Sequence, residues 1–318
     1  MRLLVDVVVA GAINWDINLF VHRFPQPGVE TPVLRVTRVA GGKAGNVAVA
    51  AARLLGAHRA AIIGALGKDD IGKEQDRLLR VEGVDTSTIT LKPDVESGQA
   101  YIIIEESGEN EIHTYFGANA MLTPEDILGD TPRKSIQSAK IVAISDPPEQ
   151  TIDAIVGIAH AVGTLIAWDP GVRSEAGMER LRPILARTNY LFLNEAEVEY
   201  MTGTGDQLEA AKQLSRISPH LALVMKSGKE GCTMFREESI TRVPGVDLQK
   251  HELHVVNTVG CGDAFLGAFS AAKAMELSDE EALDWANWAG ALKATKPETR
   301  GGPTLEELRK WMKRTERG

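Results

Sequence analysis

A carboxylate follows a glycine-rich turn and opens a long apolar segment in the C-terminal part of the chain. The stretch reads Asn257-Thr258-Val259-Gly260-Cys261-Gly262-Asp263. Apolar residues then recur at three- and four-residue spacing, which predicts a helix that packs on a sheet and begins near Asp263. The N–H groups of a helix's first turn point outward and carry partial positive charge, and glycines let a ligand approach them closely. The spacing therefore predicts an anion site with a carboxylate beside it.

A carboxylate in that position repels anions, but it can act as a base. It could take the proton from a hydroxyl that attacks a phosphoryl group, while the amides of Gly260, Cys261 and Gly262 stabilise charge on the transferred oxygens. The alternative is a glycine-rich turn in which Asp263 is an ordinary helix cap. The turn by itself does not separate these two hypotheses.

A second glycine-rich stretch lies near the N-terminus and reads Gly41-Gly42-Lys43-Ala44-Gly45-Asn46. It leads into an alanine-rich segment, 47–55, that is typical of a helix. Glycines here would let the backbone approach a ligand, and Lys43 and Asn46 add hydrogen-bond donors. The G-K-S/T ending of a Walker A loop is missing. Tight packing of small residues is the alternative.

Between these two stretches, predicted strands and helices alternate regularly, which is typical of a parallel α/β sheet. Short apolar runs predict buried parallel strands at 3–10, 60–64, 140–145, 164–168, 190–193 and 221–225, and a β-type segment at 253–256 precedes the Asp263 motif. Most of these runs end in a polar or glycine-containing tip. In an open parallel sheet such tips gather at one edge, where ligands bind.

Three further segments alternate apolar and polar residues, at 31–39, 99–105 and 111–116. This pattern predicts strands with one face in water. The segments could pair as a small sheet outside the main domain and act as a lid.

Composition limits the function classes. The 318 residues are 43% hydrophobic and 25% charged, as in a soluble globular protein with one large domain and an appendage, or with two domains. No apolar run approaches the ~20 residues needed to cross a bilayer, and acid interrupts the apolar start of the chain, so a cytoplasmic protein is expected. A net charge of -9 argues against nucleic acid as the main partner. The two cysteines, Cys232 and Cys261, form neither a disulfide framework nor a zinc pattern.

Taken together, the motifs resemble the ribokinase family (PfkB-type) of carbohydrate kinases over nearly the whole chain. The most specific parts are Gly41-Gly42-Lys43 with Asn46, Asn194-x-x-Glu197, and Gly260-Cys261-Gly262-Asp263, in this order. The resemblance implies a doubly wound, mostly parallel α/β sheet in a single domain, 1–318, with a small β-sheet lid at approximately 13–39 and 97–118. It also implies magnesium-dependent transfer of a phosphoryl group from ATP to a hydroxyl of a pentose-like sugar, and a homodimer formed through the lid.

The resemblance assigns a role to each matching position. Asp263 is the catalytic base, with Gly260, Cys261 and Gly262 as the anion hole. The acceptor would be held by Asn14, Asp16, Gly42, Lys43, Asn46 and Asp146. The nucleotide would be held by Asn194, Lys226, Ser227, Gly228, Gly231 and Asn287, and magnesium by Glu197 through water.

Departures from the family pattern leave the subtype open. Many relatives carry Asp-Thr where this chain has Asn257-Thr258, and in potassium-activated relatives that aspartate helps to form the ion's site, so activation by a monovalent cation is not expected. An asparagine at position 257 is more similar to the pattern of phosphosugar kinases. If this chain is of that type, Lys43 would meet a phosphate on the substrate, and Arg173 could reach an anionic substrate as well. Asn119 lies in a motif that is similar to ribokinase proper, whereas Asp146 lies in one that is similar to archaeal-type nucleoside kinases. The acceptor could therefore be a free sugar, a nucleoside or a sugar phosphate, and the donor ATP or ADP.

Two other function classes compete with a kinase. A non-catalytic sugar or nucleotide sensor could use the same fold, but it would not need the Asp263 carboxylate beside the anion-hole glycines. A nicotinamide-dependent dehydrogenase is disfavoured, because the first strand runs into Gly11-Ala12-Ile13-Asn14 and not into a G-x-G-x-x-G turn.

Overall fold

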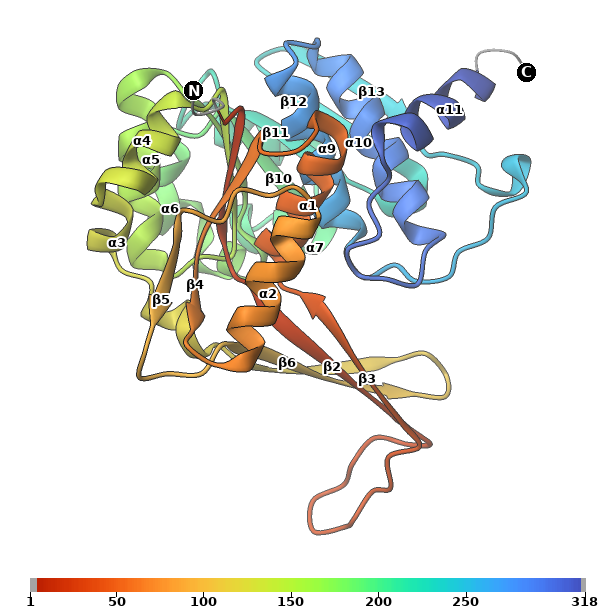
Figure 1. The fold of residues 1–318 in the computed structure, drawn as a ribbon. Coiled ribbons are helices and arrows are strands. Elements are labelled where there is room, and N and C mark those ends of the chain that lie inside the picture. The colour runs from red at the N-terminus through yellow and green to blue at the C-terminus, as the bar shows by residue number, and fades with distance from the viewer. Residues whose placement is uncertain (1–4, 316–318) are drawn as a thin grey trace.

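Nine strands form one sheet through the middle of the protein (Figure 1). The computed structural model describes residues 5–315. The strands are β1 (Val7–Gly11), β4 (Ala60–Gly67), β5 (Ile89–Lys92), β8 (Ile141–Ser145), β9 (Leu165–Asp169), β10 (Tyr190–Asn194), β11 (Ala222–Lys226), β12 (Gly231–Arg236) and β13 (Ser239–Pro244). Their order across the sheet is β13-β12-β11-β10-β9-β8-β1-β4-β5. The seven strands from β11 to β5 run parallel, and β12 and β13 extend that sheet as an antiparallel hairpin.

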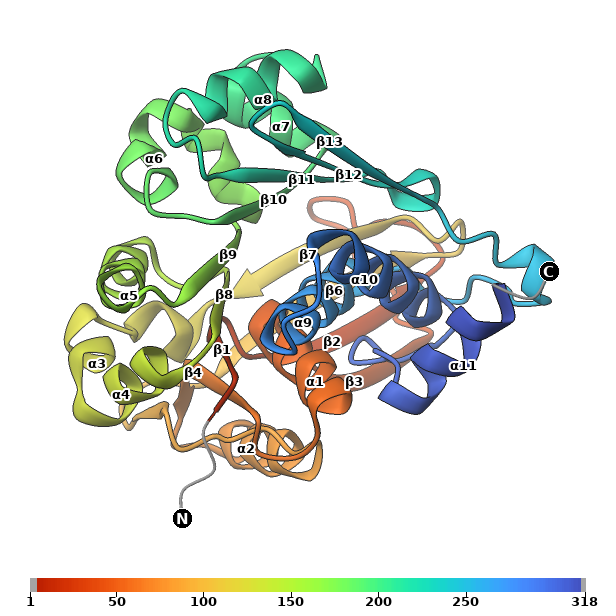
Figure 2. The same cartoon turned by 90° about the horizontal axis from the view of Figure 1, so that it is seen from above.

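Helices cover both faces of this sheet (Figure 2). One face carries α1 (Lys43–Leu55), α2 (Asp70–Val81), α9 (Cys261–Ala274), α10 (Asp279–Ala294) and α11 (Leu305–Thr315). The other carries α3 (Pro124–Leu128), α4 (Asp130–Ser138), α5 (Glu149–Val162), α6 (Gly177–Leu185), α7 (Glu195–Thr202) and α8 (Gln207–Ser215). Because both faces are covered, every residue of β1, β4 and β8 is buried, which explains their continuous apolar runs. No helix within residues 5–315 is long and apolar enough to span a membrane.

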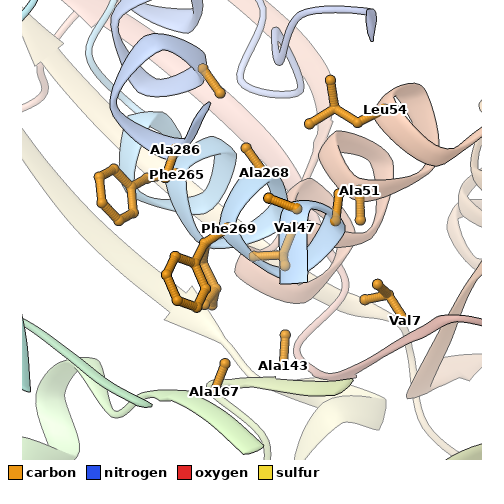
Figure 3. Packing of buried hydrophobic residues seen from close by; sticks show 14 of the residues in the cluster. Val7, Val47, Ala51, Leu54, Ala143, Ala167, Phe265, Ala268, Phe269 and Ala286 are labelled. Carbon is orange, nitrogen blue, oxygen red and sulfur yellow. The ribbon is translucent and has the colours of Figure 1, made fainter. Parts of the chain in front are cut away.

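The small residues of α1 and α9 set how closely these two helices approach. A Cβ at Gly267 would lie 2.6 Å from the carbonyl oxygen of Val47 and 2.7 Å from the Ala50 Cβ. The aromatic rings of Phe265 and Phe269 fill the space between α9 and the sheet instead (Figure 3). This close packing brings the first turn of α1 against the first turn of α9, although more than 200 residues separate them in the chain.

A four-stranded sheet extends from the edge of the main sheet at which its parallel strands end (Figure 1). It consists of β2 (Asn14–Val21), β3 (Arg35–Gly41), β6 (Gly98–Glu105) and β7 (Asn110–Tyr115), in the order β3-β2-β6-β7. The β2–β6 pair is parallel and the other two pairs are antiparallel. The chain enters β2 within three residues of the end of β1, so both sheets meet at the same place.

Most of the predicted elements within the described residues are present. Asn14 and Asp16 lie in a regular strand, β2, within the segment 13–39 that was predicted as part of the lid. Residues 253–256 form no strand, which corrects the prediction of a β-type segment there. The N–H groups of Val256 and Asn257 both donate to the carbonyl oxygen of Ala294, so the end of α10 holds this backbone in place of a neighbouring strand.

Candidate active site

Asp263 lies in the first turn of α9, and Asn46 lies in the first turn of α1. The Asn46 Nδ2 donates a hydrogen bond of 2.7 Å to the Asp263 Oδ2. Burial raises the pKa of Asp263 to about 6, while the Asn46 hydrogen bond and the cations of Lys43 and Lys226 act in the opposite direction. A carboxylate with such a pKa is ionised at neutral pH and still basic enough to accept a proton. The Asn46 Oδ1 is buried without a hydrogen-bond partner within residues 5–315, so it can accept a hydrogen bond from a ligand.

The turn before Asp263 is the predicted anion hole, and its backbone conformation leaves two N–H groups free among the described residues. Gly260 has φ 85°, and a Cβ there would lie 2.5 Å from the carbonyl oxygen of Thr299, so only glycine fits. The first helical hydrogen bond runs from the Ala264 N–H to the Gly260 oxygen. Within the described chain, no acceptor is found for the N–H groups of Gly262 and Asp263. The N–H of Cys261 differs from the expectation, because it bonds to the Thr258 oxygen at 3.2 Å.

Asp16, on β2, is a second buried carboxyl group close to Asp263. Burial raises the pKa of Asp16 to about 7, the positive charge of Arg300 lowers it, and the negative charge of Asp263 raises it. Arg300 is itself buried and donates to the Gly41 oxygen and to the Gln75 Oε1, both at 2.8 Å. Neither Arg300 nor Gln75 was predicted. No local pattern identified Gln75, whereas the Arg-Gly-Gly-Pro turn at 300–303 was a usable signal for Arg300.

Asn14 lies beside Asp16 and is held in one orientation by Asn119. The Asn119 Nδ2 donates to the Asn14 Oδ1 at 2.8 Å, and the Asn119 Oδ1 accepts from the Ile13 N–H at 2.9 Å. Gly42 packs directly against the backbone of Asn14 with φ 84°, which explains the glycine. The sequence indicates Asn119 only as part of the motif that is similar to ribokinase proper. The structure adds that its side chain positions Asn14.

Asp146, at the end of β8, lies between two cations. The Arg173 NH1 donates to its Oδ1 at 2.5 Å, and the Lys43 Nζ lies 3.7 Å from its Oδ2. Asp146 has φ 65°, a strained value for a residue with a side chain. Two positive charges against one negative charge leave this cluster, Lys43–Asp146–Arg173, with a net positive charge.

Lys226, at the end of β11, lies on the other side of Asp263. Its Nζ donates to the Asp169 Oδ2 at 2.6 Å. Burial acts to lower the pKa of Lys226, but Asp169, Glu197 and Asp263 together leave it raised, so the side chain stays cationic. The sequence motifs assign no role to Asp169, which lies at the end of β9. The pair places a fixed positive charge beside the anion hole.

A largely apolar cavity of about 270 Å³ opens beside the anion hole. Its lining includes Lys226, Gly228, Gly231, Thr258, Cys261, Gly262 and Asn287, together with Val246, Leu248, Phe265 and Ala291. The Asn287 Nδ2 donates to the Pro244 oxygen at 2.7 Å, so this side chain also anchors the end of β13. Ser227 is not part of the lining, although its N–H bonds to the Gly231 oxygen at 2.9 Å. The cavity therefore offers an apolar surface next to the first turn of α9.

A second, larger cleft of about 650 Å³ separates the small sheet from the loop around Thr258. It is lined on the sheet side by Asn18, Phe20, Arg35, Thr37, Ile102 and Ile104 and on the other side by residues 255–259 and 297–299. Val255 and Thr258 line both cavities. The two spaces therefore meet at the turn that precedes Asp263.

Asn194 and Glu197 form the N-terminal cap of α7. The Asn194 N–H donates to the Glu197 Oε2 at 2.8 Å, and the Glu197 N–H donates to the Asn194 Oδ1 at 2.9 Å. Glu197 is close enough to raise the pKa of Lys226. No group of three or more His, Cys, Asp or Glu side chains in the described part of the chain could hold a metal alone. One carboxylate with an oxygen to spare fits magnesium, which commonly keeps waters and shares its coordination with nucleotide phosphates.

The residues of the predicted site come from both ends of the chain and lie together at one edge of the main sheet. Asp263, Asn46, Asp16 and Lys43 interact electrostatically or by hydrogen bonds. Asn194 lies outside the lining of the apolar cavity, as the cap of α7.

Comparisons with known proteins identify the family of this chain. The model of the pfkB family of carbohydrate kinases matches residues 5–306. The ATP-dependent ribose-1-phosphate kinase of Halopiger xanaduensis is 30% identical over 308 residues, 96% of this chain and 97% of that protein. The ribokinase of Staphylococcus aureus is 28% identical, over 95% of this chain and 98% of that protein.

Among solved structures, Arabidopsis thaliana ribokinase complexed with ribose and ATP has a TM-score of 0.86 at 25% identity, covering 98% of this chain and 99% of that one. Nucleoside kinase from Methanocaldococcus jannaschii has a TM-score of 0.81 at 18% identity, covering 99% of each chain, a likeness that concerns the fold. The fold is ribokinase-like, and the chain belongs to the pfkB family of carbohydrate kinases, phosphotransferases that act on a sugar hydroxyl.

Proposed function

We propose that this kinase transfers the terminal phosphoryl group of ATP to a hydroxyl of a pentose-like sugar, with Asp263 as the catalytic base. The observation that carries the proposal is the carboxylate of Asp263 at the start of α9, held by Asn46 and flanked by the unpartnered N–H groups of the anion hole. A pentose is small enough to be held between Asp16 and Asn14 on one side and Asn46 on the other. Two of the relatives named above, from Halopiger xanaduensis and Staphylococcus aureus, are a ribose-1-phosphate kinase and a ribokinase.

The chemistry follows from the charges. Asp263 takes the proton of the acceptor hydroxyl as the hydroxyl oxygen attacks the terminal phosphorus of ATP. The bond from that phosphorus to the bridging oxygen breaks, and ADP leaves with the electron pair of this bond. The N–H groups of Gly262 and Asp263 and the cation of Lys226 stabilise the charge on the transferred oxygens. Asp169 holds Lys226 in place. Magnesium, which Glu197 would hold through water together with the nucleotide phosphates, supplies further positive charge there when bound. The apolar cavity that Asn287 lines would take the adenine.

A second candidate acceptor is a pentose that already carries a phosphate. The observation that favours it is the Lys43–Asp146–Arg173 cluster, whose net positive charge lies at the acceptor side of Asp263. Arginine and lysine together are typical of sites that bind phosphate groups. The Halopiger relative, which is named a ribose-1-phosphate kinase, also favours a phosphorylated pentose as the acceptor.

We further propose that the chain is one domain and that the small sheet, approximately 13–39 and 97–118, is a lid that closes over the acceptor. Closure would exclude water and limit hydrolysis of ATP. The face of this sheet opposite the cleft carries Ile17, Leu19, Tyr101 and Ile103, as the strand register shows. The outer strands add the polar side chains of Arg38, Glu111 and His113 to this face, so its apolar part lies mainly on the two central strands. That apolar strip supports a homodimer through the lid.

Phosphoryl transfer from ATP or ADP with magnesium tests the proposal against ribose, ribose phosphates, hexose phosphates and nucleosides. We expect turnover with a pentose or a pentose phosphate, and we expect Asp263→Asn to lower kcat by about 10²- to 10⁴-fold. Transfer only to a hexose phosphate or a nucleoside would contradict the proposal that the acceptor is a pentose or a pentose phosphate. Ligand binding without any transfer would instead indicate a sensor.

Arg173→Met separates the two acceptors. It should raise KM for a pentose phosphate by about 10- to 100-fold, because one hydrogen bond between charged groups is lost. KM for the free pentose should stay nearly unchanged. Arg182→Met is the matched control, because Arg182 pairs with Glu179 on the exposed face of α6. Equal effects of Arg173→Met on both acceptors would rule out a phosphate subsite.

A further inference from the structure

Arg300 is a buried cation to which the proposed reaction gives no role. It follows α10, and Arg53 on α1 holds its backbone by donating to the Arg300 and Gly302 oxygens at 2.8 and 2.7 Å. Burial lowers the pKa of Arg300 to about 10, so its guanidinium group is charged at neutral pH. Its Nη2 donates to two oxygens, whereas its Nε and Nη1 are buried without an acceptor within residues 5–315. A charge so far from water acts strongly on the groups around it.

Gln75, on α2, connects Arg300 to the sugar side of the site. None of its surface is exposed. Its Oε1 accepts from the Arg300 Nη2 at 2.8 Å, and its Nε2 donates to the backbone oxygen of Asn14. Because both ends of the amide have a partner, the side chain has a fixed orientation. Gln75 thus links the guanidinium group to the first residue of β2, which is predicted to hold the phosphoryl acceptor.

Two glycines of the stretch 41–46 make room for this arrangement. A Cβ at Gly45 would lie 2.5 Å from the Arg300 Nη2, and the three atoms nearest to it all belong to Arg300. A Cβ at Gly41 would lie 2.0 Å from the Asp16 Oδ2. The Gly41 oxygen in turn accepts from Arg300 at 2.8 Å, so the backbone of this glycine contacts both charged groups. Burial raises the pKa of Asp16, and the positive charge of Arg300 acts against this effect.

We propose that Arg300 and Gln75 are positioning residues of the acceptor site, with Arg300 as the counter-charge of Asp16 and Gln75 as the support of Asn14. The inference rests on the proposed function in one respect, namely that Asp16 and Asn14 hold the phosphoryl acceptor. Neither Arg300 nor Gln75 lines the two cavities described above, so both act through these two residues. An ionised Asp16 can accept hydrogen bonds from sugar hydroxyls, and hydrogen bonds to a charged group are the stronger ones. Loss of the counter-charge should therefore weaken binding of the sugar and leave the nucleotide site unchanged.

The first arm of the test replaces Gln75 by methionine, which has a similar length and makes neither hydrogen bond. KM for the phosphoryl acceptor should rise by about tenfold, because two hydrogen bonds are lost, while KM for ATP stays within about twofold. Asn189→Leu is the matched control: the Asn189 Oδ1 also bonds to the backbone, accepting from the Ile166 N–H at 2.8 Å, but just before β10 begins, far from the strand ends that carry the site. It should lower thermal stability and leave both KM values unchanged. A wild-type KM for the acceptor in folded Gln75→Met, or an equal rise in both KM values, would overturn the proposal.

The second arm separates charge from packing at Arg300. Methionine and lysine have unbranched side chains of similar length, but only lysine keeps the positive charge. KM for the phosphoryl acceptor should rise by about 10- to 100-fold in Arg300→Met and by less than about fivefold in Arg300→Lys. Both variants lose hydrogen bonds to the Gly41 and Gln75 oxygens, so a purely structural role predicts equal KM values. Equal values would overturn the proposal.

Gly45→Ala displaces the guanidinium group without removing any polar group. The added methyl group would lie 2.5 Å from the Arg300 Nη2, and alanine itself favours the helix α1, so this variant should fold. KM for the phosphoryl acceptor should rise by about three- to tenfold, with KM for ATP within about twofold of the wild type. If the Gln75 and Arg300 variants do not fold, this variant decides the proposal, and an unchanged KM for the acceptor would overturn it.

Every arm uses an acceptor that the wild type phosphorylates. An acceptor other than a pentose or its phosphate would contradict the proposed function, but it changes only the assay substrate of this comparison. If the protein binds a sugar without transfer, the Kd of the same variants, measured by calorimetry, takes the place of KM. Thermal unfolding shows which variants are folded.

Discussion

Replacing Asn46 by leucine should move the acid limb of the pH–rate profile to higher pH. Asp263 must be ionised to act as a base, so kcat/KM of the wild type is lost as the pH falls through about 6, the pKa of the folded protein. The Asn46 Nδ2 stabilises the ionised form through its hydrogen bond of 2.7 Å to the Asp263 Oδ2. Leucine has a similar size and no donor, so it removes this stabilisation.

The size of the shift follows from the hydrogen bond. A hydrogen bond to a charged group contributes about 1.5–3 kcal/mol, and one pKa unit corresponds to about 1.36 kcal/mol. The pKa of Asp263 should therefore rise by about 1–2 units, to about 7–8. At pH 6 about half of the wild-type Asp263 is ionised, against about a tenth or less in Asn46→Leu. Above about pH 9 the Asp263 carboxyl group is ionised in both proteins, so kcat/KM of each should approach its own maximal value.

The assay is kcat/KM between pH 5 and 9 at constant ionic strength, with ADP release as the readout. Asn46 is also predicted to contact the acceptor, so the maximal rate of Asn46→Leu should fall as well, but the position of the acid limb is independent of that loss. Asn287→Leu is the control: it alters the nucleotide cavity and should leave the limb near pH 6, because Asn287 does not contact Asp263. A limb at the same pH in the wild type and Asn46→Leu would refute the assignment of Asp263 as the base.

Three further predictions concern stability and binding. Asp263→Asn should raise the free energy of unfolding at pH 7.5 by about 1–3 kcal/mol, because burial raises the pKa of Asp263 from 3.8 to about 6. A raised pKa means that the wild type loses stability as the pH rises from about 4 to about 6, so urea unfolding should show no difference below about pH 4; a variant less stable at pH 7.5 would contradict this. Arg300→Met should lower the free energy of unfolding by about 2–4 kcal/mol, since the Gly41 and Gln75 oxygens lose a donor and Asp16 loses its counter-charge. Urea unfolding measures this, and a loss below about 1 kcal/mol would show that Arg300 is not a structural cation. Gly42→Ala should raise KM for the acceptor by about tenfold or more, because φ of 84° and contact with the backbone of Asn14 leave no room for a methyl group; steady-state kinetics that show an equal change in KM for ATP would argue against a local effect.

The local features of the site could be predicted from sequence because each depends on neighbouring residues. Glycines at 260 and 262 before an apolar periodicity placed Asp263 at a helix start, as the structure shows. Asn194-x-x-Glu197, predicted only as a motif for the nucleotide and magnesium, forms a capping box on α7, a local feature that its spacing could have indicated. In both cases a few consecutive residues determine the backbone conformation, so spacing alone is informative.

Other features depended on the fold. Lys293 has no local signal, and the Arg-Gly-Gly-Pro turn marks Arg300 without showing its partners; only the fold buries both cations against backbone oxygens. The segment 253–256 has the composition of a strand, yet Ala294 at the end of α10 supplies its hydrogen-bond acceptor. β-branched composition favours an extended backbone but does not choose its partner.

The sequence by itself therefore indicated the alternation of parallel strands and helices, the helix start at Asp263 and the polar residues at the strand ends. The tertiary structure decided which of these groups meet: α1 packs closely on α9, so Asn46 reaches Asp263 across more than 200 residues, and burial raises the pKa values of Asp16 and Asp263. The physical reason is that backbone conformation responds to adjacent residues, whereas desolvation and charge pairing depend on atoms brought together from distant parts of the chain.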